Sequence, residues 1–168
     1  MKNNCIYFVE GQCETKLIEA LKEEPQRLRP GKIKVWNLIK NEIPSSILLT
    51  IKEGSVVVLV FDTDVLQTDK LKKNIQNLKT HCKKINIVYL VQVLNLEDEL
   101  VRCTDVSKVQ DLTNSNSKRE FKRDFCAMTN CRQVLDRHHL DVEKLWNSRY
   151  PEEFTDEPSG DAETQKEE

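Results

Sequence analysis

The sequence lacks any apolar run approaching the roughly 18 residues that a membrane-spanning helix requires. No secretory leader is expected either, since residues 1–4 lead into a short strand-like run and not into a long apolar segment. No internal repeat, heptad pattern or Walker-type glycine loop is present, so nucleotide hydrolysis has no support in the sequence. We therefore expect a cytoplasmic protein without a membrane partner.

A disulfide framework is not expected either, although the chain has six cysteines. Without a secretion signal we expect a reducing compartment, in which thiols stay free and behave as small buried side chains. One group could bind zinc, because Cys126 and Cys131 are followed by His138 and His139. Its spacing does not match an established zinc motif, so free thiols are the favoured interpretation.

The formal net charge is −2, but the charged residues are distributed unevenly along the chain. Residues 151–168 hold eight acidic residues against one lysine and almost nothing apolar, which predicts a disordered acidic tail. The rest of the chain has 25 basic and 20 acidic residues. A mildly basic body suits a polyanionic partner. The tail is best interpreted as a solubilising end; occupation of the basic surface by the tail is the alternative.

The order of apolar segments predicts a single α/β domain, which is what 168 residues usually form. Four strand-like segments are 5–9, 32–36, 56–61 and 85–91. Helical segments between them are 14–23, 45–51 and about 70–83. We expect a mainly parallel, Rossmann-like sheet of about four strands flanked by helices.

The last third of the chain has helical periodicity and no strand-like run. We expect residues 1–103 to form the α/β core and residues 104–150 to form a helical extension packed on it. Within the extension, Phe121, Phe125 and Met128 are expected to pack onto the sheet.

Acidic residues follow two of the apolar strand segments directly. Glu10 and Gly11 follow the first, and Asp62 and Asp64 follow the run at 56–61. Because the carboxyl ends of parallel strands meet at one edge of a sheet, the three carboxylates should gather there. Hard oxygen ligands in such a group favour Mg²⁺ or Mn²⁺.

This pattern resembles the TOPRIM family over roughly residues 4–100: Glu-Gly after a first strand, a helix, and Asp-x-Asp after a later strand. The family includes topoisomerases, primases, OLD-like nucleases and small nucleases of mobile-element and phage-defence systems. The resemblance implies that Glu10 acts as general acid/base or metal ligand and that Asp62 and Asp64 are metal ligands. Gly11 would let the chain turn tightly and leave the backbone open to a phosphate.

Further acids could complete a second metal site, as the resemblance to OLD-like nucleases implies. Glu97 and Glu99 are the candidates after the fourth strand, and Glu14 is a candidate one turn beyond Glu10. The alternative for residues 97–99 is the first turn of a helix capped by Asn95, where acids complement the helix dipole. Glu14 has the same alternative.

The densest basic group near the end of the domain could bind a phosphate backbone. Its members are Lys118, Arg119, Lys122 and Arg123. For any one of them, a solvated helix face is the alternative.

The predicted function is therefore a Mg²⁺- or Mn²⁺-dependent nuclease acting on DNA or RNA, in the setting of a phage-defence or toxin effector with a companion protein. No tyrosine placement supports a topoisomerase, and the chain is too short for a primase's accessory modules. Two alternatives stay open: a non-catalytic TOPRIM-like module that binds nucleic acid or a partner, and a receiver-like or flavodoxin-like signalling domain. The receiver pattern fits less well, because no lysine directly follows the strand that ends at Val91.

Overall fold

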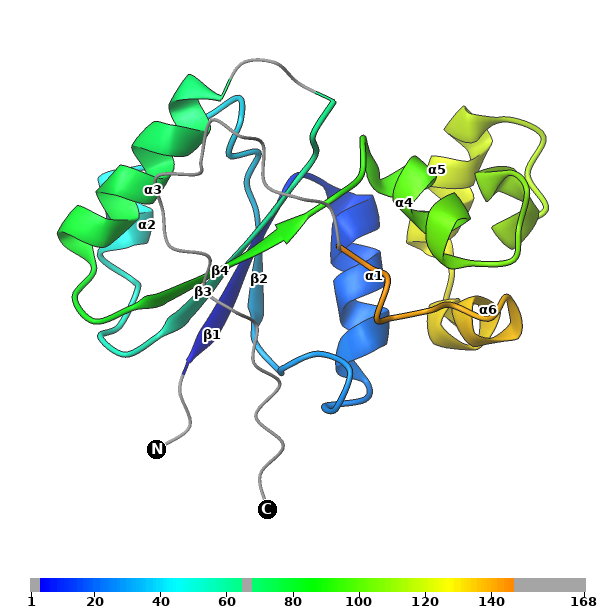
Figure 1. The fold of residues 1–168 in the computed structure, drawn as a ribbon, viewed down its shortest axis with the longest axis horizontal. Coiled ribbons are helices and arrows are strands. Elements are labelled where there is room, and N and C mark those ends of the chain that lie inside the picture. Colours follow the sequence, from blue (N-terminus) through cyan, green and yellow to red (C-terminus); the bar gives the residue numbers. More distant parts are fainter. Residues whose placement is uncertain (1–3, 65–67, 147–168) are drawn as a thin grey trace.

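A four-stranded, all-parallel sheet with helices on both faces confirms the predicted α/β class (Figure 1). The computed structural model describes residues 4–64 and 68–146. The strands are β1 (Cys5–Val9), β2 (Lys32–Val35), β3 (Val56–Phe61) and β4 (Asn86–Val91), and the helices are α1 (Gln12–Lys22), α2 (Ser45–Leu48), α3 (Asp69–His81), α4 (Leu96–Cys103), the 3₁₀-helix η1 (Val109–Leu112), α5 (Lys118–Ala127) and α6 (Cys131–Arg137).

The strand order is β2-β1-β3-β4, and all four strands are parallel. Successive strands are therefore added toward one edge of the sheet after β1 and toward the other edge after β3. From β1 the chain crosses through α1 to β2, whereas from β3 it crosses through α3 to β4 on the other side. In an open parallel sheet, the carboxyl ends of the strands at such a switch point form a crevice in which ligands bind. Here Glu10 follows β1 and Asp62 follows β3, one on each side of the switch point.

Alternation along the strands divides the core between the two faces of the sheet. Phe8 and Leu59 pack with α2 and α3 on one face, while Val9 and Val60 pack with Ile18 of α1 on the other. All five residues of β1 are buried, which explains why its sequence is continuously apolar. By contrast, β2 is an edge strand of alternating lysines and apolar residues, as predicted.

A second layer of helices, α4, η1, α5 and α6, lies beyond α1 (Figure 1). Leu17 and Leu21 of α1 pack there with Phe121 and Phe125, whose ring centroids are 5.2 Å apart. The prediction that these phenylalanines pack onto the sheet is wrong: among the described residues, this cluster contains no strand residue. The reason is that α1 has two apolar faces, with Ile18 toward the sheet and Leu17 and Leu21 toward the helical layer.

Several boundaries differ from the predictions. The helix predicted over 45–51 ends at Leu48, because the backbone N–H groups of Thr50 and Ile51 donate to the carbonyls of Ile47 and Leu48 in tighter turns.

Within the described ranges, no helix is both long and apolar enough to cross a bilayer. The acidic segment 151–168, predicted to be disordered, lies outside the described residues.

Candidate functional site

Glu10 joins the ends of three strands at the carboxyl edge of the sheet. Its Oε1 accepts a hydrogen bond from the backbone N–H of Asp62 at 3.4 Å, and its Oε2 accepts one from Nδ2 of Asn37 at 3.0 Å. Asn37 follows β2 and is itself fixed, because its Oδ1 accepts from the backbone N–H groups of Ile39 and Lys40. The predicted meeting of the first and third strand ends therefore occurs, with Glu10 directly touching the backbone of Asp62.

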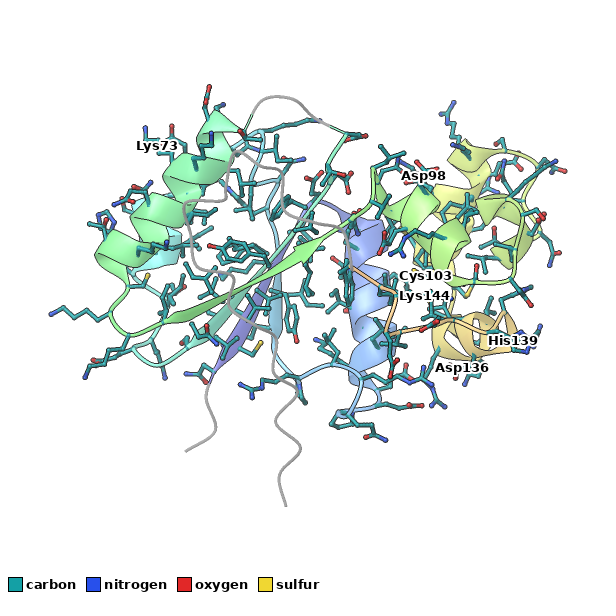
Figure 2. The ribbon with its side chains drawn as sticks, viewed as in Figure 1. Lys73, Asp98, Cys103, Asp136, His139 and Lys144 are labelled. Atoms are coloured by element: carbon teal, nitrogen blue, oxygen red, sulfur yellow. The ribbon has the colours of Figure 1, made fainter. Side chains whose placement is uncertain are left out.

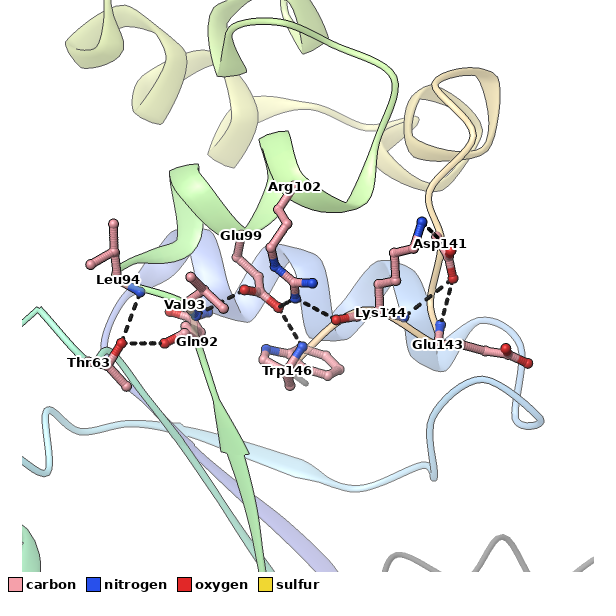
Figure 3. Close-up of polar contacts among 10 residues, drawn as sticks. All are labelled: Thr63, Gln92, Val93, Leu94, Glu99, Arg102, Asp141, Glu143, Lys144 and Trp146. Atoms are coloured by element: carbon pink, nitrogen blue, oxygen red, sulfur yellow. Dashed lines mark hydrogen bonds and ion pairs between the residues drawn. The ribbon is translucent and has the colours of Figure 1, made fainter. Parts of the chain in front are cut away.

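The loop after β3 is held by the loop after β4 (Figure 3). Thr63 donates its hydroxyl to the carbonyl of Gln92 at 2.8 Å and accepts from the N–H of Leu94 at 2.9 Å. The N–H groups of Thr63 and Asp64 both donate to the carbonyl of Leu94. These bonds fix the backbone at Asp62 and Asp64 and connect it to the segment that begins α4.

Glu14 lies in the first turn of α1 and is 9% exposed. The expected contribution of Gly11 needs correction, since its φ of −157° and ψ of −168° are extended values that any residue adopts. Its small size matters instead, because a Cβ at this position would lie 3.2 Å from Oε2 of Glu14. Gly11 therefore makes room for a buried carboxylate.

Glu97 adds a carboxylate from α4, and Lys122 of α5 forms an ion pair with it. The Nζ of Lys122 lies 2.8 Å from Oε1 of Glu97, whose side chain is 12% exposed. The bond to Glu97 raises the pKa of Lys122, and Glu14 contributes in the same direction. Lys122 is thus placed at the boundary between the acids and the helical layer.

Glu99 does not belong to this group, which corrects the proposal of a ligand at that position. It is fully buried, and its oxygens are occupied: Oε1 accepts from Arg102 at 2.7 Å and from the Trp146 N–H, and Oε2 accepts from the Val93 N–H (Figure 3). Glu97 and Glu99 are two positions apart on α4 and so lie on different sides of the helix, which prevents both from reaching the same point. Asn95 caps this helix through the Asp98 N–H, as the alternative interpretation of residues 97–99 predicted.

The acids at the strand ends repel one another and are partly withdrawn from water. Burial, followed by the charges of Glu10, Glu14 and Asp64, raises the pKa of Asp62 to about 8. Burial also raises the pKa of Glu10, against the hydrogen bond from the Asp62 backbone, and raises that of Glu14, where the charge of Glu97 adds to it. Such a group binds protons unless a cation is supplied.

Gln92 is a site residue that the sequence reasoning missed. It follows β4 as Asp62 follows β3, and its backbone N–H donates to the carbonyl of Phe61. Its carboxamide is fully buried, and among the described residues neither of its polar atoms has a hydrogen-bond partner; the same holds for Oδ1 of Asp62, which is also buried. Buried polar atoms are normally satisfied, so these atoms require water or a ligand. The available signal was a glutamine within the apolar run at 87–94.

These residues fit a divalent cation in their chemistry but not in their present side-chain positions. Carboxylate and carboxamide oxygens are the donors that Mg²⁺ and Mn²⁺ prefer, and the unpaired Oδ1 of Asp62 fits a ligand. In the positions described, however, no three acidic, histidine or cysteine side chains are placed so that they could hold one ion together. The chemistry of the donors fits, and side-chain rotations would be needed to bring them to one point.

The other predicted basic residues lie on α5 away from the acids. Arg123 pairs with the neighbouring Asp124 at 2.8 Å, and Lys118 and Arg119 are exposed. All three lie on the solvent-exposed part of the α5 surface. Of the four, only Lys122 contacts an acid of the site.

The residues considered for zinc do not converge. His138 and His139 both bond to Asp105 at 3.0 Å. Cys131 is buried, whereas Cys126 lies beside Cys13. His139 and Asp136, at the far end of the helical layer, are remote from the strand ends (Figure 2). The favoured interpretation as free thiols agrees with these positions.

Comparisons of this chain with family models, with curated proteins and with solved structures find no match.

Proposed function

We propose that the carboxylates at the ends of β1 and β3 bind a divalent cation, Mg²⁺ or Mn²⁺, and that the protein is a nuclease that depends on it. One observation carries the proposal: at the switch point of the parallel sheet Glu10 accepts a hydrogen bond from the backbone of Asp62, and the charges of Glu10, Glu14, Asp64 and Glu97 add to burial in raising the pKa of Asp62. A cation would offset their repulsion and draw them together.

In this proposal Asp62, Asp64 and Glu10 hold the cation, with Glu14 and Glu97 as further candidates. A bound divalent cation would activate water and stabilise the negative charge that develops on a phosphodiester. The raised pKa of Glu10, caused mainly by burial, suits a group that acts as a general acid or base. Lys122 stands beside the acids, where an ammonium could hold a phosphate of the substrate.

The decisive experiment follows cleavage of supercoiled plasmid, single-stranded DNA and RNA with Mg²⁺, with Mn²⁺ and with a chelator. Glu10→Gln and Asp62→Asn should each abolish cleavage. The matched control is Glu53→Gln, because Glu53 is exposed, precedes β3 and pairs with Lys84 at the opposite edge of the sheet. It should cleave like the native protein. Equal cleavage by all four proteins would indicate a contaminating nuclease and contradict the proposal.

Cation binding is measured separately from cleavage. Mn²⁺ is paramagnetic, so on binding it should broaden the backbone amide signals of residues 10–14 and 62–64 selectively, and Asp62→Asn should weaken the effect. Broadening without cleavage of any substrate would favour the alternative of a non-catalytic binding module. Absence of both would reject the site.

The strand order favours a second candidate. The order 2-1-3-4 begins the flavodoxin-like arrangement, in which an aspartate at the end of β3 can accept a phosphoryl group. Asp62 occupies that position, but its Oδ1 is buried. A mass increase at Asp62 after treatment with acetyl phosphate and Mg²⁺ would support a receiver-like domain, and an unchanged mass would count against it.

A further inference from the structure

Two cysteines that are far apart in sequence meet where α1 and α5 touch. Cys13 lies in the first turn of α1, and Cys126 lies in the last turn of α5. Their sulfur atoms are 3.2 Å apart, although 113 positions separate them in the chain. The Cys13 thiol is also 3.7 Å from the Lys122 carbonyl. This is a close non-bonded contact between two reduced side chains.

The contact is held by its surroundings. Lys16, on the next turn of α1, donates to the carbonyl of Met128 at 2.9 Å just after α5. Leu17 packs with Phe121 and Phe125 in the shared core. A disulfide has a sulfur–sulfur distance of about 2.05 Å, so the two atoms need to approach by roughly 1.2 Å. The two helices are already in contact, so the movement that remains is small.

Accessibility separates this pair from the other cysteines. Cys13 and Cys126 are half-buried, whereas Cys5, Cys82, Cys103 and Cys131 are buried. An oxidant from solvent therefore meets this pair first. A thiol that has a second thiol in contact forms a disulfide instead of stopping at the sulfenic acid.

We propose that Cys13 and Cys126 form a dithiol site that takes a two-electron oxidant of the peroxide class and closes to a disulfide. One thiolate attacks a peroxide oxygen, giving a sulfenic acid and releasing water after protonation. The second thiolate then attacks the sulfenic sulfur and displaces its oxygen as a second water. Overall, two thiols lose two electrons and two protons, and one peroxide becomes two waters.

The new bond would join α1 to α5 beside the carboxylates, because Glu14 follows Cys13 and Lys122 precedes Cys126 by one turn. It would fix Lys122 relative to Glu14 and close a loop of more than a hundred residues. A constraint on so long a loop restricts the unfolded chain, so oxidation should raise the midpoint of thermal unfolding by about 5 °C or more.

The experiment treats reduced full-length protein with hydrogen peroxide, and in a second arm with oxidised glutathione, before alkylation and mass spectrometry. Cleavage after glutamate releases residues 11–14, which contain Cys13 alone, and fragmentation distinguishes Cys126 from Cys131. We expect titratable thiols to fall from six to four and a Cys13–Cys126 linkage to form. Linkage in the peroxide arm identifies that oxidant; linkage in the glutathione arm alone would overturn the assignment to peroxide.

Two variants make the test specific. Cys126→Ala should lose the linkage, and the matched control Cys131→Ala, which removes the buried thiol near it, should keep it. A predominant Cys126–Cys131 linkage, or over-oxidation of Cys13 without any linkage, would overturn the proposal. Denatured protein should give mixed linkages, which shows that the fold selects the pair.

Discussion

Replacing Asp62 with asparagine should stabilise the protein at neutral pH. Burial is the largest cause of the raised pKa of Asp62, about 8, and the neighbouring carboxylates add to it. Between about pH 4 and about pH 8 the folded state therefore binds more protons than the unfolded chain, so the free energy of unfolding decreases as the pH rises through this range. Asparagine keeps the shape and removes the charge, so the variant should lose part of this decrease.

The magnitude follows from the interval between the ordinary and the folded pKa. From the ordinary value of 3.8 to pH 7 is about 3 pH units, and each costs about 1.4 kcal/mol, which gives an upper limit of about 4 kcal/mol. Water reaches part of the side chain, and Glu10 shares the repulsion, so we expect Asp62→Asn to add about 1–3 kcal/mol at pH 7. Near pH 4 the two proteins should be almost equally stable.

Urea unfolding followed by circular dichroism at about pH 4 and about pH 8 measures both values. The control is Asp136→Asn, because Asp136 pairs with Arg27 at 2.8 Å on the surface and its loss should cost up to about 1 kcal/mol. Mn²⁺ should stabilise the native protein at the higher pH and the Asp62 variant less. A native stability that does not change between pH 5 and pH 8, or a variant less stable than the native protein at both pH values, would refute the reasoning.

Three further substitutions test other parts of the site. Lys122→Ala should weaken nucleic-acid binding and reduce the slope of log K against log salt concentration by about 1, while cation affinity is kept or increased. Fluorescence anisotropy measures this slope, and an unchanged slope would exclude a phosphate contact. Glu99→Ala should cost about 3–5 kcal/mol in urea unfolding, because it leaves Arg102 without its buried partner, yet Mn²⁺ broadening of the folded protein should persist; loss of broadening would return Glu99 to the site. Gln92→Leu should stabilise the cation-free protein by about 1–3 kcal/mol by removing unpaired buried polar atoms, and should weaken Mn²⁺ binding; a loss of stability would indicate that water satisfies the amide.

The parts of the fold that could be predicted are those with a local cause. The continuous apolar run of β3 indicates a buried strand, and the alternation of β2 indicates an edge strand. The helical spacing of Leu71, Ile75 and Leu78 indicates the buried face of α3. The meeting of Glu10 and Asp62 followed from a rule about parallel sheets, and their hydrogen bond agrees with it.

The parts that could not be predicted depend on long-range packing. Cys13 and Cys126 are brought together only by the docking of α5 on α1, and nothing near either residue indicates the other. Glu97 and Glu99 are chemically alike and two positions apart, but the rotation of α4 about its axis sends one to the acids and the other into the core. Local spacing does not determine that rotation, because it is set by the packing of Leu96 and Leu100.

Helix α1 packs against both the sheet and the helical layer, so it contributes side chains to two hydrophobic cores. If the helical layer opens locally, the sheet keeps Glu10 and Asp62, but Glu97 and Lys122 depart with the layer. The charge around the strand ends would then depend on a partial unfolding event. Amide hydrogen exchange should show the order of events, with α5 and α6 exchanging before β1 and β3, and α1 between them.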